Sequence, residues 1–469
     1  MSNYNKNIDP KNIILMTDSY KVSHSKQYPE GTETVYSYFE SRGGEFDDVV
    51  FVGLQYFLQE YLEGQVVTQE RIDEAEEFFH LHFGNDTCFN RKGWEHILDK
   101  HDGRLPVRIK AVKEGTVVPT HNVMLTIENT DPKCWWLTNY LETLLVQVWY
   151  PCTVATISRT SRLIIEHALE KSGTPADVMF KLQDFGFRGV SSVETAGIGG
   201  FAHLVNFMGS DTVAALVLAR NHYNTKMAGF SIPASEHSTI TSWGKEGEVN
   251  AFRNMLEQYP TGLVACVSDS YDIYKACSEL WGNELKAEVL ARDGTLVVRP
   301  DSGDPQSVVL ECLERLGKAF GFTTNEKGYK VLDPHVRIIQ GDGVDRWAIA
   351  KILKAMMAAG WSADNIGFGS GGALLQKMNR DTQKFAFKCS WIRVNGEGRD
   401  VFKDPIDAPG KRSKPGRLAL VAMTGKNGNE IMTVPESSAS DADLLETVFV
   451  NGVTTRTQTL DEIREITWG

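Results

Sequence analysis

From about residue 178, short apolar runs alternate with polar or glycine-rich turns and with amphipathic stretches. The clearest of these units begin with LVACVSDS, LVVRPDSG, VRIIQGDG and NIGFGSGG. Their turns fall near residues 269, 301, 342 and 370, so successive units are about 28 to 41 residues long. This length suits one β-strand followed by one helix, and a succession of such units predicts parallel strands.

Two architectures accommodate successive strand–helix units: an open doubly wound sheet and a closed barrel. In both, ligands bind at the carboxyl ends of the strands. Each of the four turns places polar or charged residues at such an end, which the packing of a buried strand does not require. The pattern leaves the architecture open and predicts a binding site along this edge.

The rest of the chain has a different pattern. Within the first 150 residues, ETVYSYFESRG and LPVRIKAVKEGTVVPTHNVMLTIENT read as antiparallel strands, and RIDEAEEFFHLHFG reads as a helix. The segment FAFKCSWIRVNGEGRDVFKDP is again rich in strand and turn residues. We therefore expect an α+β domain over residues 1–150, a βα core over 151–384, and a β-rich basic segment over 385–469 that completes the α+β domain.

Composition narrows the class of protein. The 469 residues are 42% hydrophobic and 23% charged, as in ordinary globular proteins. No apolar run approaches the roughly 20 residues of a membrane helix, and the amino-terminal MSNYNKNIDPKN lacks the apolar segment of a secretory signal. The seven cysteines form no CxxC pair, which argues against a disulfide framework and against a zinc site. We expect a cytoplasmic protein that binds no membrane.

Charge is unevenly distributed along the chain. The formal net charge of −12 disfavours nonspecific binding of nucleic acid. Residues 376–417, however, contain 11 Lys or Arg and 5 Asp or Glu, a local net charge of +6. Such a segment either holds a phosphorylated ligand or forms a solvated face.

Two glycine turns indicate a phosphate site. Gly367, Gly369 and Gly372 form a GxGxxG pattern between a predicted strand and a helix. A dinucleotide-binding fold would place an acidic residue about 20 positions further on, and no acid clearly fills that position. Small residues still allow backbone N–H groups to approach a phosphate. QGDGVD, residues 340–345, offers a second such turn one unit earlier.

LVVRPDSGDP shows most clearly what the strand ends carry. An apolar strand over 296–298 is followed by Arg299 and Asp301, and Asp304 with Pro305 opens the next helix. Together with Asp269 at an earlier strand end, Asp301 can hold Mg²⁺ and phosphate oxygens, because hard cations prefer oxygen ligands.

Further candidate side chains stand at other strand ends: Phe185, Arg188, Asp211, Glu236 and His237. A phenylalanine is most often a core residue, and Asp211 suits the cap of the helix predicted at TVAALVLARNHY. A single histidine is more often structural than catalytic. His237, however, lies in a polar turn of the βα series, and the neighbouring Glu236 can orient it as a nucleophile. No HxxxH or HExxH spacing predicts metal binding by histidine.

Eight motifs occur together and in a characteristic order: TDSYKVSHSKQYP, DFGFRGVSSVETAGIGG, PASEHSTI, VSDSYDIY, RPDSGDP, QGDGVD, FGSGGALLQK, and FKDP followed by KRSK. From about residue 12 onward, the chain resembles the nicotinamide phosphoribosyltransferases, a type II phosphoribosyltransferase family. The resemblance implies transfer of the 5-phosphoribosyl group from phosphoribosyl pyrophosphate to nicotinamide, giving nicotinamide mononucleotide and pyrophosphate for NAD salvage. It further implies α/β architecture, with a half-open or irregular βα barrel and a flanking α+β domain. The other implied features are a homodimer with shared active sites, Mg²⁺, and ATP hydrolysis through a phosphorylated histidine.

The resemblance also assigns roles around the pyridine and the ribose. Phe185 would stack on the pyridine ring, with the partner subunit's Tyr20 on the opposite face. Asp211 would accept from the carboxamide. Asp301 would face the ribose hydroxyls or Mg²⁺, and Asp269 would assist the metal or orient His237.

The remaining implied roles concern phosphate groups. The pyrophosphate would meet Arg188, His237 and Arg299, and its outer side would be lined by Arg42, Lys403 and Lys411. The 5′-phosphate would be held by Gly341, Asp342, Gly371 and Gly372, together with Arg380 and Lys388 of the partner subunit.

The chain departs from the family pattern at Ala265 and Ala386, where members carry serine. Each missing hydroxyl should weaken ligand contacts by about 1 kcal/mol, which affects affinity and inhibitor sensitivity rather than the reaction. Two other functions remain open. The carboxylate of Asp211 disfavours a nicotinate phosphoribosyltransferase, and a non-catalytic nucleotide-binding or signalling protein on the same fold would not need His237, Asp301 and the basic segment together.

Overall fold

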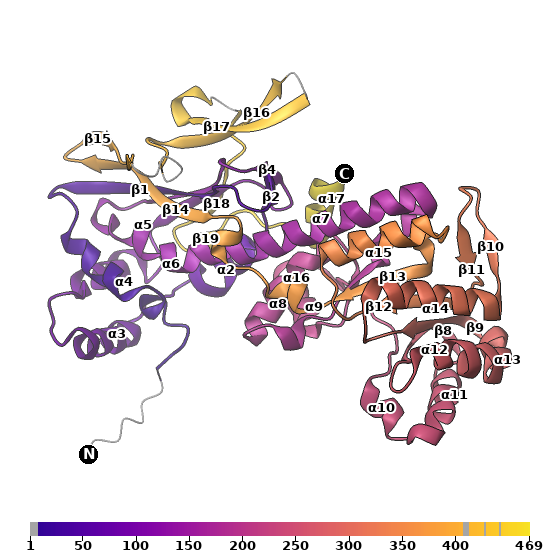
Figure 1. Ribbon diagram of the computed structural model, residues 1–469. Coiled ribbons are helices and arrows are strands. Elements are labelled where there is room, and N and C mark those ends of the chain that lie inside the picture. The colour runs from indigo at the N-terminus through magenta and orange to yellow at the C-terminus, as the bar shows by residue number, and fades with distance from the viewer. Residues whose placement is uncertain (1–7, 407–411, 426–427, 440–441) are drawn as a thin grey trace, which may run out of the picture. The chain divides into compact units, whose positions relative to one another are not determined.

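The computed structural model describes residues 8–406, 412–425, 428–439 and 442–469. The chain divides into two compact units. Unit 1 contains Met1–Thr153, His222–Asn224 and Asn379–Gly469, and unit 2 contains Val154–Asn221 and Thr225–Met378. Unit 1 is an α+β domain and unit 2 is an irregular βα barrel (Figure 1), which confirms the expected α/β fold class.

Unit 1 is built on a seven-stranded antiparallel sheet that combines early and late parts of the chain. Its strands, in spatial order, are β15 (Glu397–Asp400), β14 (Phe385–Val394), β1 (Thr32–Ser41), β5 (Val123–Asn129), β3 (Val107–Ala111), β18 (Glu446–Val450) and β19 (Val453–Thr454). Tyr38 at the centre of β1 pairs with Lys388 on one side and Thr126 on the other.

The other elements of unit 1 are helices and two-stranded hairpins. The two longer helices that lie wholly in this unit are α3 (Gln69–Phe83) and α4 (Arg91–His101), which begin after the capping side chains of Thr68 and Asn90. The shorter elements are α1 (Ser19–Val22), α2 (Leu54–Phe57), α5 (Leu137–Tyr140), α6 (Glu142–Leu145), α17 (Leu460–Trp468), and the strand pairs β2 (Asp48–Val50) with β4 (Val117–Pro119) and β16 (Leu418–Gly425) with β17 (Gly428–Pro435). Helix α7 (Trp149–Ser172) contains the boundary between the units.

Unit 2 is built on six parallel strands. In spatial order they are β7 (Gly209–Ser210), β6 (Leu182–Asp184), β13 (Ile366–Ser370), β12 (Val336–Gln340), β9 (Asp293–Arg299) and β8 (Thr261–Val267). The segment 230–234 spans the space between the two edge strands, because Phe230 bridges to Gly209 and Ala234 bridges to Ala265. The sheet is therefore a curled half-barrel whose opening is crossed by an irregular segment.

Helices follow the strands of unit 2 as the repeating pattern predicts. They are α8 (Val193–Leu204), α9 (Val213–His222), α10 (His237–Thr241), α11 (Glu248–Gln258), α12 (Ile273–Lys275), η9 (Ala276–Glu284), α13 (Lys286–Ala291), α14 (Pro305–Phe320), α15 (Arg346–Ala358) and α16 (Gly372–Leu375), and a hairpin of β10 (Phe322–Thr324) and β11 (Lys330–Leu332) follows α14. Helix α14 begins as predicted, with Pro305 in its first turn and Asp304 accepting the amide of Ser307. It packs against β12 and α15 (Figure 1).

Alternate residues of each barrel strand face opposite sides. Leu296 and Val298 of β9 belong to the core packed under the helices. Val297 instead packs with Ala265 and Ile339 in a separate interior cluster. Arg299 has the parity of Val297, so the strand directs it toward the barrel interior. Within the described ranges, no helix is long and apolar enough to cross a membrane.

Candidate active site

Arg299 lies at the carboxyl end of β9 with part of its guanidinium available. Its Nη2 donates to Asp301 Oδ2 at 3.2 Å, which fixes the side chain across the turn. Its Nε is buried and, among the described residues, has no hydrogen-bond partner. A buried donor without a partner costs free energy, and a ligand that accepts from it removes that cost. Arg299 is therefore suited to an anionic ligand.

His237 is the first residue of α10 and is held by a carboxylate from another strand end. Its Nε2 lies 3.0 Å from Asp269 Oδ1, and its Nδ1 lies 4.0 Å from Asp301 Oδ2. The Asp269 side chain is only 4% exposed, and its second oxygen accepts the hydroxyl of Ser302 at 2.6 Å. With both its oxygens engaged, Asp269 orients the imidazole.

The orienting role expected for Glu236 is not what the structure shows. Glu236 is the N-cap of α10 and forms a capping box with Thr239, and its carboxylate accepts the hydroxyl of Ser238. These bonds satisfy the amino terminus of the helix. The carboxylate that contacts His237 is that of Asp269.

The ring of Phe185 rests against glycines of two neighbouring strand ends. A Cβ placed on Gly369 would lie 2.0 Å from Phe185 Cε2, and one on Gly341 would lie 3.4 Å from the same atom. The phenylalanine is half-buried and also packs against the interior cluster that contains Ala265 and Val297. The central glycine of the GxGxxG pattern thus makes room for an aromatic side chain.

Two cavities of unit 2 meet at this ring. One, of about 680 Å³, is mostly apolar and is lined by Ala265, Val297 and Ile339, with Asp211 among its polar residues. The other, of about 500 Å³, is polar, and its lining residues include His237, Asp301, Gly341, Asp342, Gly371 and Gly372. Phe185, Arg188 and Arg299 line both. The arrangement offers an apolar slot for a flat ring directly beside a polar chamber with two arginines.

The side chain of Asp211 lines the apolar cavity and does not cap the following helix, α9. Its carboxylate accepts the hydroxyl of Ser231, and both residues line the cavity. The sequence also allowed Asp211 to cap the amino terminus of α9, where its carboxylate would accept a backbone amide. The structure instead shows the carboxylate accepting a side-chain hydroxyl, that of Ser231. An exposed carboxylate at the wall of the cavity can accept a hydrogen bond from a donor on a flat ligand bound there.

Asp184 is a residue of the site that the sequence argument missed. It is fully buried at the end of β6, where it accepts the amide of Gly186 at 2.7 Å and the hydroxyl of Ser210 at 3.4 Å. Burial raises the pKa of its carboxyl to about 6. A Cβ on Gly200 would lie 2.8 Å from its Oδ2. Asp184 is a positioning residue that fixes the loop carrying Phe185. The signal in the sequence was a carboxylate at the end of a predicted strand, directly before Phe185.

The remaining predicted residues belong to unit 1. Tyr20, on α1, is 59% exposed. Arg42 follows β1 and donates from Nε to Glu40 at 2.9 Å, while its buried Nη2 has no partner among the described residues. The same Glu40 also pairs with Lys414. Arg42 therefore resembles Arg299 in keeping a donor free.

The predicted residues of the basic segment differ in exposure. Arg380 and Lys403 are exposed, and Lys388 on β14 is half-buried. Burial lowers the pKa of Lys388, with nearby positive charges adding to the effect. Lys411 lies outside the described residues.

Comparisons with known proteins agree over nearly the whole chain. The model of the nicotinate phosphoribosyltransferase (NAPRTase) family matches residues 180–453, and that of the nicotinamide phosphoribosyltransferase N-terminal domain matches residues 12–109. The nicotinamide phosphoribosyltransferase of Xanthomonas campestris pv. campestris is 53% identical over 97% of each chain. That of Acinetobacter baylyi is 36% identical over 98% of this chain and 97% of its own.

Solved structures show the same fold. The nicotinate-nucleotide pyrophosphorylase of Pyrococcus furiosus superposes with a TM-score of 0.61 at 17% identity, covering 100% of this chain and 97% of its own. Human nicotinic acid phosphoribosyltransferase gives 0.59 at 17% identity, with 97% and 93% covered. The sequence relatives confirm the resemblance that the eight motifs indicated, and the chain is an enzyme of the nicotinamide phosphoribosyltransferase family.

Proposed function

We propose that the enzyme transfers the 5-phosphoribosyl group from phosphoribosyl pyrophosphate to nicotinamide, forming nicotinamide mononucleotide and pyrophosphate in NAD salvage. The observation that carries the proposal is the junction of the two cavities at Phe185, Arg188 and Arg299. A pyridine in the apolar cavity and a phosphorylated sugar in the polar cavity would have their reacting ends at this junction. The names of the close relatives support the same reaction.

The chemistry needs placement and charge neutralisation more than proton transfer. The pyridine nitrogen attacks C1 of the ribose while the bond from C1 to the pyrophosphate oxygen breaks and that oxygen keeps the electron pair. The sugar acquires oxocarbenium character and the leaving group gains negative charge, which Arg188 and Arg299 would stabilise. Phe185 would hold the ring in line with C1, because stacking restrains a flat ring at little polar cost. The product pyridinium carries the positive charge, so no proton is lost.

Asp211 would select the pyridine. Nicotinamide presents an NH₂ donor to the carboxylate that Ser231 holds at the cavity wall, whereas nicotinate presents a second negative charge. At about 4 Å and an effective dielectric constant of about 20, two like charges cost roughly 4 kcal/mol, on the order of a thousandfold in preference.

One assay tests both the reaction and the selectivity. The purified protein is incubated with phosphoribosyl pyrophosphate, Mg²⁺ and either nicotinamide or nicotinate, and the mononucleotides are separated chromatographically. We expect nicotinamide to be strongly preferred, and Asp211→Ser to lose most of the discrimination with an almost unchanged melting temperature. No mononucleotide from either base would refute the proposed function. An unchanged preference in Asp211→Ser would place the selectivity elsewhere.

We propose Mg²⁺ as the cofactor, held by Asp301 rather than Asp269. Both oxygens of Asp269 are engaged, by His237 and Ser302. Asp301 contacts Arg299 through Oδ2 only, and its Oδ1 lies toward Gly341 at the polar cavity. A carboxylate oxygen beside a phosphate chamber fits a hard cation. Bound there, Mg²⁺ would offset the negative charge of the pyrophosphate.

We also propose that ATP phosphorylates His237. Because Nε2–H donates to Asp269, the lone pair of the imidazole lies on Nδ1, which faces the polar cavity near Asp301. Attack of Nδ1 on the γ-phosphorus of ATP would release ADP, and water would later hydrolyse the phosphohistidine to phosphate. The added negative charge next to Arg299 would favour release of pyrophosphate from the site over the reverse reaction with the mononucleotide.

His237→Ala tests this role of ATP. The variant should lose ATP hydrolysis and its stimulation of mononucleotide formation, and should retain some basal transfer. His335→Ala is the matched control, because His335 also contacts an aspartate in unit 2 but does not line either cavity. Undiminished ATP hydrolysis in His237→Ala would exclude the phosphohistidine.

We further propose a homodimer in which unit 1 of one protomer completes the site of its partner. The exposed ring of Tyr20 and the free donor of Arg42 support this arrangement, since both are suited to a ligand supplied from outside unit 1. Exposed apolar side chains of Phe402 and Ile406, next to Lys403, suit a protein interface. Among the described residues the seven cysteines form no disulfide, which supports a reducing compartment such as the cytoplasm.

A further inference from the structure

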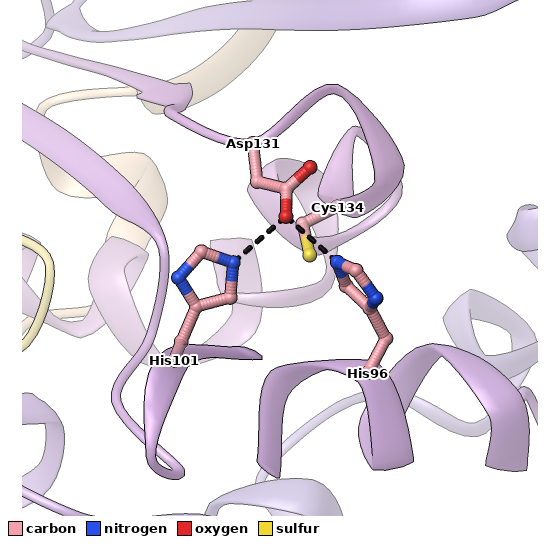
Figure 2. Close-up of side chains that lie close together, drawn as sticks. All are labelled: His96, His101, Asp131 and Cys134. Carbon is pink, nitrogen blue, oxygen red and sulfur yellow. Dashed lines mark hydrogen bonds and ion pairs between the residues drawn. The ribbon is translucent and has the colours of Figure 1, made fainter. Parts of the chain in front are cut away.

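Four potential metal ligands converge in unit 1, which does not contain the two cavities of the proposed active site. His96 and His101 come from α4, Asp131 is the N-cap of the short helix η4 (Pro132–Cys134), and Cys134 is the last residue of η4. One ligand atom from each of the four side chains lies within 4.8 Å of all the others. Figure 2 shows both imidazoles pointing at the carboxylate, with the thiol beside it.

Local structure fixes the carboxylate in place. Asp131 is the N-cap of η4, and its Oδ1 accepts the amide of Lys133 at 2.8 Å. This bond turns Oδ2 toward the histidines, so that His96 Nε2 and His101 Nε2 each lie 2.7 Å from it (Figure 2). The carboxylate is thus oriented by the backbone and not only by the histidines themselves.

The two helices that supply the ligands are packed closely. The buried ring of Trp94 on α4 meets Trp136, which follows η4, in an edge-to-face contact with centroids 4.8 Å apart. A Cβ on Gly93 would lie 2.8 Å from the Trp136 ring, so this glycine allows the close approach. Helix α4 ends at His101 because Asp102 adopts the left-handed conformation with φ 51°. The histidines and the aspartate–cysteine pair therefore sit on a rigid frame.

The donor set matches one class of metal ion. Two imidazoles, a carboxylate and a thiol are the ligands of tetrahedral Zn²⁺ in proteins, whereas Ca²⁺ and Mg²⁺ require oxygen ligands. The thiol of Cys134 is fully buried, and His96, His101 and Asp131 are 18%, 24% and 19% exposed. A rim that is partly open above a buried sulfur allows an ion to enter and be enclosed.

We propose that His96, His101, Asp131 and Cys134 form a structural Zn²⁺ site. Binding would replace the two histidine–carboxylate hydrogen bonds, moving each nitrogen from 2.7 Å to about 3.3 Å from the oxygen, as tetrahedral bonds of about 2.0 Å require. The proton on each Nε2 would pass to Nδ1 through solvent, and the thiol would release its proton. The ion then balances one carboxylate and one thiolate, so the buried site is neutral.

The sequence argued against zinc because it contains no CxxC, HxxxH or HExxH pattern. The ligands instead come from two short motifs, H-x₄-H at residues 96–101 and D-x₂-C at 131–134. A strand pair, β3 with β5, lies between them in the chain and brings the second motif back to α4. Spacing rules for a single motif do not detect such a site.

Cobalt spectroscopy of the full-length protein tests the proposal. After metals are removed with a chelator, Co²⁺ is titrated into the protein, and Zn²⁺ is then used in competition. We expect one equivalent per chain to give a thiolate-to-cobalt band in the near ultraviolet and the intense visible bands of tetrahedral cobalt, both abolished by Zn²⁺. A cation at Asp301 gives no thiolate band, so the active site does not interfere. Absence of this band in the wild-type protein would overturn the proposal.

Variants identify the ligands. Cys134→Ser should lose the thiolate band, and Cys389→Ser, which changes another cysteine of unit 1, should retain it. His101→Ala, at the partly exposed rim, should weaken Zn²⁺ binding at least about tenfold. This variant replaces Cys134→Ser in the test if Cys134→Ser does not fold. Chelator should lower the melting temperature of the wild type more than that of either ligand variant. A thiolate band that persists in Cys134→Ser, or a melting temperature that responds equally in all variants, would refute the site.

Discussion

At the scale of single residues, the proposed place of the pyridine ring depends on the Phe185 side chain and on Gly369, which has no side chain. Phe185 would supply the stacking face, and the absence of a Cβ at Gly369 leaves the space that the Phe185 ring occupies. The two residues come from β13 and from the loop after β6, which are adjacent parallel strands. Backbone geometry alone does not explain this glycine, since it is the neighbouring ring that excludes a Cβ.

Gly369→Ala should therefore raise the KM for nicotinamide at least tenfold, with a smaller effect on the KM for phosphoribosyl pyrophosphate. The added Cβ would meet the Phe185 ring at 2.0 Å and push it into the apolar cavity. Gly367→Ala is the matched control on the same strand, because its Cβ would make an ordinary contact of 4.0 Å with Ile339. Steady-state kinetics of the two variants test this prediction. Equal KM values for nicotinamide in Gly369→Ala and Gly367→Ala would mean that Phe185 does not set the position of the pyridine ring.

Residues at strand ends were predictable, and their partners were not. The apolar run that opens LVVRPDSG indicates that Arg299 and Asp301 stand together at the end of a buried strand, and the topology of parallel strands then brings Asp269 to the same edge. The local pattern does not say whether Asp269 or the adjacent Glu236 contacts His237, because that choice depends on how the segment before His237 pairs with β8. The family resemblance, by contrast, did allow Asp269 to orient His237. Asp184 was missed for a similar reason, since its burial follows from the approach of α8.

At the scale of elements, the junction of β6, β7 and α8 encloses a carboxyl group with a raised pKa. Asp184 lies at the end of β6, bonds to Ser210 of β7 and faces Gly200 of α8. Burial raises its pKa from the ordinary 3.8 to about 6, and its bond from the Gly186 amide only partly offsets this effect. The folded protein therefore binds this proton more tightly than the unfolded chain does.

This linkage fixes the direction of a pH effect on stability. The contribution of Asp184 is fully present below about pH 4 and is lost as pH rises through about 6. Asp184→Asn cannot titrate, so its stability relative to wild type should rise between pH 4.5 and 7 by about 2 kcal/mol, the part of the linkage between pKa values of 3.8 and about 6 that falls in this range. Melting temperatures measured across this range for both proteins provide the comparison. A constant difference between them would show that Asp184 titrates normally.

The regular elements of unit 2 follow from the hydrophobic pattern, whereas two irregular ones do not. The strands β8, β9, β12 and β13 and the helices α14 and α15 were predicted from period and capping. The segment 230–234 makes only isolated bridges and so carries no alternating pattern. The π-helix η9 follows α12 where the repeating pattern predicted one helix after the strand.

At the scale of the whole molecule, unit 1 is assembled from both ends of the chain, as β14 pairs with β1 and β18 pairs with β3. The sequence indicated such an assembly because β-rich segments flank the βα series. It did not indicate strand order, since the pairing of Tyr38 with Lys388 joins positions that no local pattern connects. A homodimer with shared sites would give these two strands a further role, because Lys388 and Arg42 both lie on or beside them.

Complementation between inactive subunits tests the shared site. Tyr20→Ala and Asp301→Ala should each be nearly inactive as pure homodimers, because one lacks the ring expected to stack on the pyridine and the other lacks the group proposed to hold Mg²⁺. Mixed heterodimers should regain up to one working site, since one of the two composite sites then contains both native residues. Activity that stays at zero after mass spectrometry has confirmed subunit exchange would contradict the shared site.

The strand order of unit 1 has a consequence for the growing polypeptide. β1, β5 and β3 lie side by side in the middle of the sheet, and the strands that cover both flanks, β14 and β18, are synthesised last. At about 5 to 20 residues per second, the stretch between Asn129 and Phe385 takes roughly 10 to 50 s to translate. During that time the nascent three-stranded ribbon has two unpaired edges, which are templates for aggregation. Messages truncated before the codon for Phe385 should therefore yield insoluble products, even though the chain of the barrel unit is complete by Met378.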